Sequence, residues 1–170
     1  MRAGAERTCK ALMTGFLALM LLSSIIPASA LVTETISRRD LVIDMGDGWT
    51  TEAQLAFPAV GDGPFPGVLL IPGGGAPDMD EYMPPYSTES GEPARPHLQI
   101  AEYLSERGFA VIRYNKRGVG FNSSLADPGV FFNTTIQDLQ RDAETVLKVL
   151  RKQGEVDADD ITLLGHSEST

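Results

Sequence analysis

The pattern of apolar and polar positions opens with a segment that predicts a β-hairpin. Residues 41–43 form an apolar run, residues 45–48 carry glycine and aspartate residues that favour a turn, and residues 49–57 alternate loosely between apolar and polar side chains. Two strands joined by a short turn pair antiparallel. We therefore expect an antiparallel hairpin within residues 31–59.

Three short runs further along predict strands, and the first is a continuous apolar run that is typical of a strand buried on both faces of a sheet. They lie at residues 68–71, 109–114 and 161–164. Helical spacing of apolar residues separates these runs. The first helix is predicted to begin at Pro96, which suits an initial helical position, and to stop before Gly108.

The second helix is expected to begin near Thr135, where Asp138 stands three residues on as a weak capping pair, and to close at Gly154. Its apolar stripe comprises Ile136, Leu139, Ala143, Val146, Leu147 and Leu150. The resulting order is strand–strand–strand–helix–strand–helix–strand. This order predicts the α/β class, in which an antiparallel hairpin leads into a parallel sheet with flanking helices.

Two irregular segments interrupt this order. Residues 73–95 form a long loop with three consecutive glycines and an acidic stretch at 78–81, and long loops in compact domains are often functional. The acidic stretch would either border a pocket or lie solvated in the loop, and we expect the second. Residues 121–134 predict a further loop. Arg117, in the turn before it, is expected to bond turn carbonyls or acids.

The first thirty residues predict a signal peptide. Three basic residues precede an apolar run, and the small residues at 28–30 suit a signal peptidase. A retained membrane anchor is the alternative, but a run of about 16 residues is at the short end for a spanning helix. We expect cleavage after Ala30 and a secreted or extracytoplasmic product of residues 31–170, with membrane attachment only where the segment is retained.

Charge and cysteine content narrow the partners and the source of stability. The formal net charge is −9, and residues 31–170 are more acidic still because residues 1–30 hold three basic residues and one acidic residue. Nucleic acids and anionic membranes bind basic patches, so neither is expected as a partner. The single cysteine, Cys9, lies in the first thirty residues, so residues 31–170 depend on an apolar core rather than on a disulfide.

The strongest chemical motif follows the last predicted strand. Residues 165–169 read Gly-His-Ser-Glu-Ser, close to the Gly-x-Ser-x-Gly turn that raises a serine hydroxyl above the edge of a sheet. A helix after such a turn directs its N-terminus at the reacting oxygen and favours negative charge there. We predict Ser167 as a nucleophile, with Gly165, His166 and Ser169 shaping the turn. A serine in an ordinary loop is the alternative.

A glycine segment after the first buried strand complements this serine. Residues 73–75 are all glycine, which allows close approach of the backbone to a ligand. Two backbone N–H groups directed at a carbonyl oxygen stabilise the charge that acyl transfer builds there. By position we assign these donors to Gly74, or its immediate neighbour, and to Glu168. A flexible turn is the alternative, and a dinucleotide loop fits less well because its third glycine and its helix are missing.

On these residues the chain resembles the α/β-hydrolase superfamily, near its dienelactone-hydrolase-like, EstD-like esterase and serine-aminopeptidase-like branches. The matching segments are residues 66–75, 113–120 and 163–168. The resemblance implies the N-terminal half of an α/β-hydrolase fold over residues 31–170. It also implies hydrolysis of a small ester, thioester or peptide-like amide through an acyl-enzyme on Ser167, with neither a metal nor an organic cofactor.

The chain departs from the family pattern at three points. Ser169 stands where the family usually has glycine, where its Cβ meets a crowded contact, and Asn115 stands where related sequences often have aspartate. The triad acid and histidine follow the serine in this superfamily, so both are expected to be missing from a fold truncated after its nucleophile turn. His166 is expected to diverge from Ser167, and His97 to be solvated or capping, so neither is expected to be the general base.

The main interpretation is a secreted serine hydrolase of the esterase kind, whose residues 1–170 alone have little or no activity. The alternative outside catalysis is an inactive remnant of a hydrolase fold, or a secreted binding module that kept only the scaffold. Within catalysis, a serine peptidase is the alternative, because substrate specificity depends on later parts of such folds.

Overall fold

The computed structural model describes residues 34–169 of the chain. The predicted signal segment, its cleavage site at Ala30 and the start of the expected hairpin lie outside these residues. No helix within residues 34–169 is long and apolar enough to cross a membrane.

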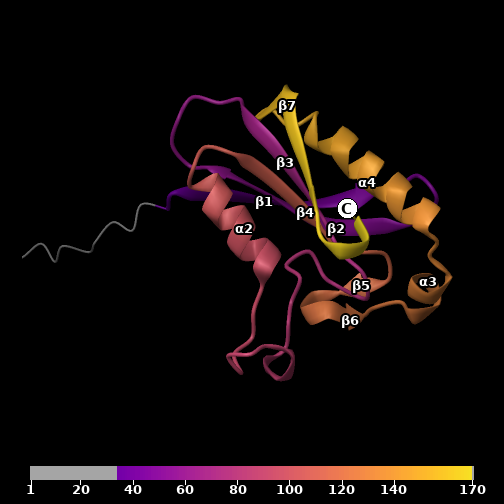
Figure 1. Ribbon diagram of the computed structural model, residues 1–170. Coiled ribbons are helices and arrows are strands. Elements are labelled where there is room, and N and C mark those ends of the chain that lie inside the picture. Colours follow the sequence, from indigo (N-terminus) through magenta and orange to yellow (C-terminus); the bar gives the residue numbers. More distant parts are fainter. Residues whose placement is uncertain (1–33, 170) are drawn as a thin grey trace, which may run out of the picture. The chain divides into compact units, whose positions relative to one another are not determined.

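A five-stranded mixed sheet forms the centre of the described residues (Figure 1). Its strands are β1 (Ile36–Asp44), β2 (Thr50–Pro58), β3 (Phe65–Ile71), β4 (Ala110–Tyr114) and β7 (Val156–Gly165), in the order β1-β2-β4-β3-β7. β2 pairs antiparallel with both β1 and β4, whereas β3 runs parallel to both β4 and β7. The predicted hairpin and the predicted parallel sheet are therefore confirmed.

The helix α2 (Pro96–Ser105) covers one face of this sheet (Figure 1). Its Ala101 packs with Val68 and Leu70 of β3 and with Val111 of β4. Because side chains alternate between the two faces of a strand, the residues between these positions point to the opposite face. This alternation explains why the buried strands read as continuous apolar runs in the sequence.

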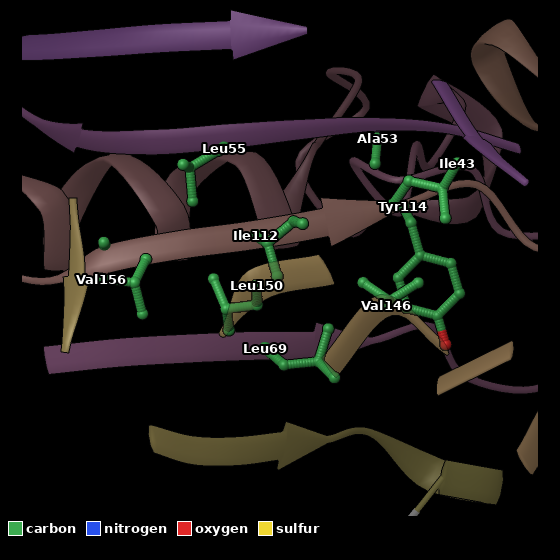
Figure 2. Packing of buried hydrophobic residues seen from close by; sticks show 10 residues of the cluster. Ile43, Ala53, Leu55, Leu69, Ile112, Tyr114, Val146, Leu150 and Val156 are labelled. Atoms are coloured by element: carbon green, nitrogen blue, oxygen red, sulfur yellow. The ribbon is translucent and has the colours of Figure 1, made fainter. Parts of the chain in front are cut away.

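The helix α4 (Ile136–Leu150) covers the opposite face (Figure 1). Figure 2 shows how its inward side chains meet those of β3, β4, β7 and the β1–β2 hairpin in the larger core cluster. The labelled members are Ile43, Ala53, Leu55, Leu69, Ile112, Tyr114, Val146, Leu150 and Val156. Burial of each large aliphatic side chain contributes about 1.5–3 kcal/mol relative to an exposed one, so this cluster is the main source of stability.

The start of α4 matches the predicted capping pair. The hydroxyl of Thr135 accepts a hydrogen bond from the N–H of Asp138 (3.2 Å), and the carboxylate of Asp138 accepts one from the N–H of Thr135 (2.8 Å). The hydrogen bonds from Thr135 also hold the pKa of Asp138 below its usual value. The helix ends at Leu150, and a turn carries the chain through Gly154 to β7.

The structure differs from the predicted loop at residues 121–134, which contains several short elements. These are η2 (Phe121–Ser123), β6 (Ser124–Leu125), which pairs with β5 (Val119–Gly120), and α3 (Pro128–Asn133); a further turn, η1 (Pro85–Ser87), lies in the long loop. α3 begins at a local cap, because the carboxylate of Asp127 accepts a hydrogen bond from the N–H of Val130 (3.0 Å). A helix of six residues has too few turns to show an apolar period, which is why the sequence did not indicate it.

The strand β7 begins five residues earlier than its apolar run predicts. Phe65 and Pro66 pair with Val156 and Asp157, and a register shift then leads to the pairing of Gly67 with Ile161. Such an irregularity accommodates extra residues in one strand. The polar residues in that stretch concealed the first half of the strand.

Arg117, just after β4, joins three parts of the fold. Its guanidinium donates two hydrogen bonds of 2.6 Å to the carboxylate of Asp142 on α4 and lies 2.7 Å from the carboxylate of Asp47 in the β1–β2 turn. Burial raises the pKa of Asp142, although the hydrogen bonds from Arg117 oppose this, and the hydrogen bond from Arg117 lowers the pKa of Asp47. The expected bonding of Arg117 to acids is confirmed.

Replacement of Asp142 by alanine should lower the free energy of unfolding by about 3 kcal/mol, because the buried guanidinium of Arg117 then keeps only the carboxylate of Asp47. Glu144→Ala, on the exposed side of the same helix, is the matched control and should change it by less than about 0.5 kcal/mol. Urea unfolding followed by circular dichroism measures both values. Equal effects of the two substitutions would mean that the pairing with Asp142 adds nothing to stability.

Candidate active site

The carboxyl ends of β3 and β7 lie side by side, since the two strands are parallel and Ile71 pairs with Gly165. The glycine segment 73–75 follows β3, and the turn at residues 166–169 follows β7. Loops that leave the carboxyl ends of neighbouring parallel strands form the usual binding crevice of an α/β sheet. The fold therefore brings the two predicted motifs to one place.

Ser167 begins the short helical turn η3 (Ser167–Ser169) directly after β7 and has a φ of 58°. Residues with a side chain rarely adopt this left-handed backbone, and where they do the strain often accompanies function. The turn is also very tight, because a Cβ placed on Gly165 would lie only 2.1 Å from the carbonyl oxygen of Ser169. Only glycine fits at position 165.

Ser169, at the position where the family pattern has glycine, makes hydrogen bonds that glycine lacks. Its hydroxyl accepts a hydrogen bond from the N–H of His166 (3.0 Å). The same hydroxyl lies 3.1 Å from the carbonyl oxygen of Ile71 and 2.9 Å from that of His166, and it can donate to one of them at a time. Ser169 therefore ties the turn to the end of β3 instead of merely being tolerated there.

The glycine segment passes directly against this turn. A Cβ placed on Gly73 would lie 2.9 Å from the carbonyl oxygen of His166, and one placed on Gly74 would lie 3.3 Å from Oε2 of Glu168. Glycine is thus required at position 73 by the approach of the two backbones. Gly74 and Glu168, the residues predicted to donate two N–H groups to an oxyanion, are neighbours across this contact.

The acidic stretch 78–81 is held against the sheet, and the expectation of a solvated loop was wrong. Asp78 is 3% exposed, and its carboxylate accepts hydrogen bonds from backbone N–H groups of its own loop. The carboxylate of Asp80 lies 2.9 Å from the guanidinium groups of both Arg95 and Arg113. Buried charges need such partners, and these lie too far away in the sequence to be recognised from local pattern.

Glu81 brings a carboxylate to the contact between the glycine segment and the turn. Its Oε1 accepts a hydrogen bond from the N–H of Gly73 (3.2 Å), lies 3.3 Å from Nδ1 of His166, and lies 3.4 Å from Nε2 of His97. An ionised carboxylate only accepts hydrogen bonds, so His166 donates from Nδ1 in this arrangement. The side chain of Glu81 is only 12% exposed.

His97 is buried, so the expectation of a solvated or capping residue was wrong. Its side chain is 2% exposed, and neither ring nitrogen has a well-aligned hydrogen bond among the described residues. Burial lowers the pKa of His97 below its ordinary value, and the nearby carboxylate of Glu81 opposes this shift in part. The imidazole is therefore neutral at pH 7 and packs behind Glu81.

Lys116 contacts the same glycine segment from another direction. Its ammonium group donates a hydrogen bond to the carbonyl oxygen of Gly73 (3.1 Å) and lies 3.2 Å from Oε2 of Glu168. The residue is 7% exposed, which is unusual for lysine. The sequence analysis did not connect Lys116 with the site, because Lys116 follows β4 whereas Gly73 follows β3, 43 residues earlier.

Asn115, where related sequences often have aspartate, uses both ends of its amide. Oδ1 accepts a hydrogen bond from the N–H of Met79 (2.7 Å), and Nδ2 donates one to the carboxylate of Glu52 (3.2 Å). An aspartate could not donate and would face the carboxylate of Glu52. The amide thus joins the acidic loop to β2.

A cleft of about 330 Å³ borders Ser167, between the long loop and the turn at residues 166–169. Tyr82 and Met83 from the long loop line one side, and Glu81 and His166 are also among its lining residues. A second hollow of about 350 Å³ lies between α4 and the end of β3, but Ser167 is not among the residues that line it. Within residues 34–169, no group of three or more His, Asp or Glu side chains is placed to hold a metal ion.

Replacement of Gly73 by alanine should lower the free energy of unfolding by about 1–3 kcal/mol, because the added Cβ overlaps the carbonyl oxygen of His166. Gly154→Ala is the matched control, since a Cβ at this exposed position meets no atom within 4 Å. Denaturant unfolding of both variants measures the difference. A Gly73→Ala variant as stable as the control would contradict the close approach of the two loops.

Comparison with known proteins gives one sequence relative and several structural ones, while no family model matches the chain. The chain is 34% identical over 107 residues to esterase EstD of Thermotoga maritima, a match that covers 63% of this chain and 22% of that protein. The chain therefore spans less than a quarter of the length of this curated relative.

Solved structures share the fold at low sequence identity. Esterase Est22 matches with a TM-score of 0.56 at 18% identity, over 80% of this chain and 36% of that one. A dienelactone hydrolase-like promiscuous phosphotriesterase from metagenomic libraries matches with a TM-score of 0.54 at 19% identity, over 77% and 49%. A bacterial heroin esterase matches with a TM-score of 0.51 at 21% identity, over 94% and 42%. The sheet order, the flanking helices and these matches show that the described residues have the N-terminal part of an α/β-hydrolase fold.

Proposed function

We propose that the complete protein is a serine hydrolase that cleaves a carboxylic ester through an acyl-enzyme on Ser167. The similarity to a protein named as an esterase supports this class of reaction. So does the meeting of a serine turn and a glycine segment at the carboxyl ends of two parallel strands. Thioesters and amides have the same acyl carbonyl and belong to the same proposal.

The observation that carries the proposal is the backbone of Ser167. A serine with φ 58° two residues after the end of a parallel strand is costly unless its surroundings enforce it, and here the close packing of Gly165 against Ser169 does so. The strained turn sets the hydroxyl at the rim of a cleft. This is the arrangement that a serine nucleophile requires to reach a substrate carbonyl.

The N–H groups of Gly74 and Glu168 are the proposed donors to the oxyanion. Acyl transfer places negative charge on the carbonyl oxygen, and N–H groups that are already oriented stabilise it without rearrangement. The near contact of Gly74 with Glu168 supports a joint role for these two backbone positions.

The general base and its carboxylate partner are proposed to come from chain beyond Thr170. Both described histidines are engaged by Glu81: His166 through Nδ1, and His97 by burial behind the carboxylate. The described residues cover less than half of each solved structure compared above, which leaves room for later elements to complete the site. A base must reach the serine hydroxyl and be oriented by a third group.

The substrate is proposed to be a small ester. The cleft beside Ser167 is about 330 Å³, and Tyr82 and Met83 give it an aromatic and a flexible apolar wall. Such a wall suits a short acyl or alcohol group, while peptide substrates remain an outcome that the experiment below distinguishes.

The test uses protein expressed from the complete gene. Hydrolysis of short-chain p-nitrophenyl esters and covalent labelling by a fluorophosphonate should both be lost in Ser167→Ala, with kcat reduced by more than about 10⁴-fold because the nucleophile is gone. Ser90→Ala, a substitution of an exposed serine in the long loop, is the matched control and should retain both properties.

Retention of esterase activity in Ser167→Ala would disprove the proposed nucleophile. A folded protein that neither hydrolyses esters or peptide substrates nor reacts with the fluorophosphonate would instead favour the binding-module interpretation. Turnover of peptide substrates alone would assign the peptidase alternative.

We further propose that residues 1–30 direct export and are removed after Ala30, on the sequence pattern alone. Mass spectrometry of the exported protein should then find Leu31 as its first residue. An intact N-terminus in the membrane fraction would contradict cleavage and identify the apolar run as an anchor.

A further inference from the structure

Both backbone polar groups of Gly73 are held by charged side chains. Its N–H donates to the carboxylate of Glu81 (3.2 Å), and its carbonyl oxygen accepts from the ammonium group of Lys116 (3.1 Å). Hydrogen bonds in which one partner is charged are about twice as strong as those between neutral groups. Gly73 directly precedes Gly74, so these bonds also limit where the N–H of Gly74 lies.

The same two side chains reach across to the turn that carries Ser167. The carboxylate of Glu81 bonds to Nδ1 of His166 (3.3 Å), and the ammonium group of Lys116 lies 3.2 Å from the carboxylate of Glu168. His166 and Glu168 are the residues immediately before and after Ser167. Two charged bridges of opposite sign therefore join the glycine segment to the turn, one on each side of the serine.

Both bridging groups are themselves fixed by burial. The side chains of Glu81 and Lys116 are 12% and 8% exposed, which weakens competition from water. Glu81 also has a left-handed backbone, with φ 54°, and the buried ring of His97 packs behind its carboxylate. A charged side chain held in this way keeps one orientation instead of exchanging among many in solvent.

We propose that Glu81 and Lys116 are positioning residues, which set the separation between the glycine segment and the nucleophile turn. They thereby set the placement of the two oxyanion donors, and in this the proposal rests on the function proposed above. Three consecutive glycines would otherwise leave that segment with many backbone conformations. In this role each residue acts through the backbone of Gly73 and through a neighbour of Ser167, although Glu81 also lines the cleft beside Ser167.

The expected consequence is a loss of transition-state stabilisation with little change in substrate binding. An oxyanion donor displaced by about 1 Å loses much of its effect, and such misplacement costs about 10- to 100-fold in rate. Glu81→Ala and Lys116→Met should each lower kcat by about 10- to 100-fold and change KM by less than about threefold. Glu81→Gln retains an oxygen acceptor for the N–H of Gly73, so it should recover part of the loss.

The experiment compares these variants in protein from the complete gene, with p-nitrophenyl ester kinetics and the rate of fluorophosphonate labelling as readouts. Glu89→Gln, at an exposed position of the same loop, and Lys148→Met, on the exposed side of α4, are the matched controls and should retain full kcat. Because Glu81 and Lys116 act on the backbone of one residue, Gly73, the double variant should lose less than the product of the two single losses. Circular dichroism confirms that each variant is folded.

Full kcat in Glu81→Ala and Lys116→Met, with activity still dependent on Ser167, would overturn the positioning role and leave the proposed function intact. Activity that persists in Ser167→Ala would overturn the proposed function itself. An increase in KM with unchanged kcat would also contradict the inference, because it would assign these residues to substrate binding. If Glu81→Ala fails to fold, the nearly isosteric Glu81→Gln variant decides by whether its kcat falls.

Discussion

The parallel pairing of β3 with β7 forces two backbone segments into closer contact than side chains permit. Gly73 meets the carbonyl oxygen of His166 across this pairing, and within the turn after β7 Gly165 meets the carbonyl oxygen of Ser169. At both places a Cβ would overlap another backbone atom, so glycine is required by geometry and not by flexibility alone. The left-handed backbone of Ser167 is sustained by this crowding, which is how the fold places a strained serine at the rim of a cleft.

Buried basic residues in β4 and directly after it stabilise this arrangement. Arg113, Lys116 and Arg117 are all buried, in a chain whose net charge is −9. Each meets at least one carboxylate: Asp80, Glu168 and Asp142, respectively. A buried charge is tolerated when its partner is well placed, and loss of either partner is then costly. These ion pairs attach the acidic loop, the turn at residues 166–169 and α4 to the end of β4.

The sequence predicted those elements whose signal is local and repeated. The apolar runs of β3 and β4, the stripe of α4 and its Thr135–Asp138 capping box all appear in the structure. It did not predict α3, which is too short to show an apolar period, or the polar first half of β7, whose pairing depends on a register shift in its neighbour. These elements depend on a local cap or on a partner strand, and neither leaves an apolar pattern.

The sequence by itself indicated the candidate chemistry: Ser167 just after a strand, and glycines at 73 and 165 where the backbone must come close. Only the tertiary structure decided which charged groups stand around that serine. Glu81 and His166 are 85 residues apart, and Lys116 and Gly73 are 43 apart. These contacts depend on the order and register of the strands. The sequence around each residue does not indicate which distant residue the sheet will place beside it.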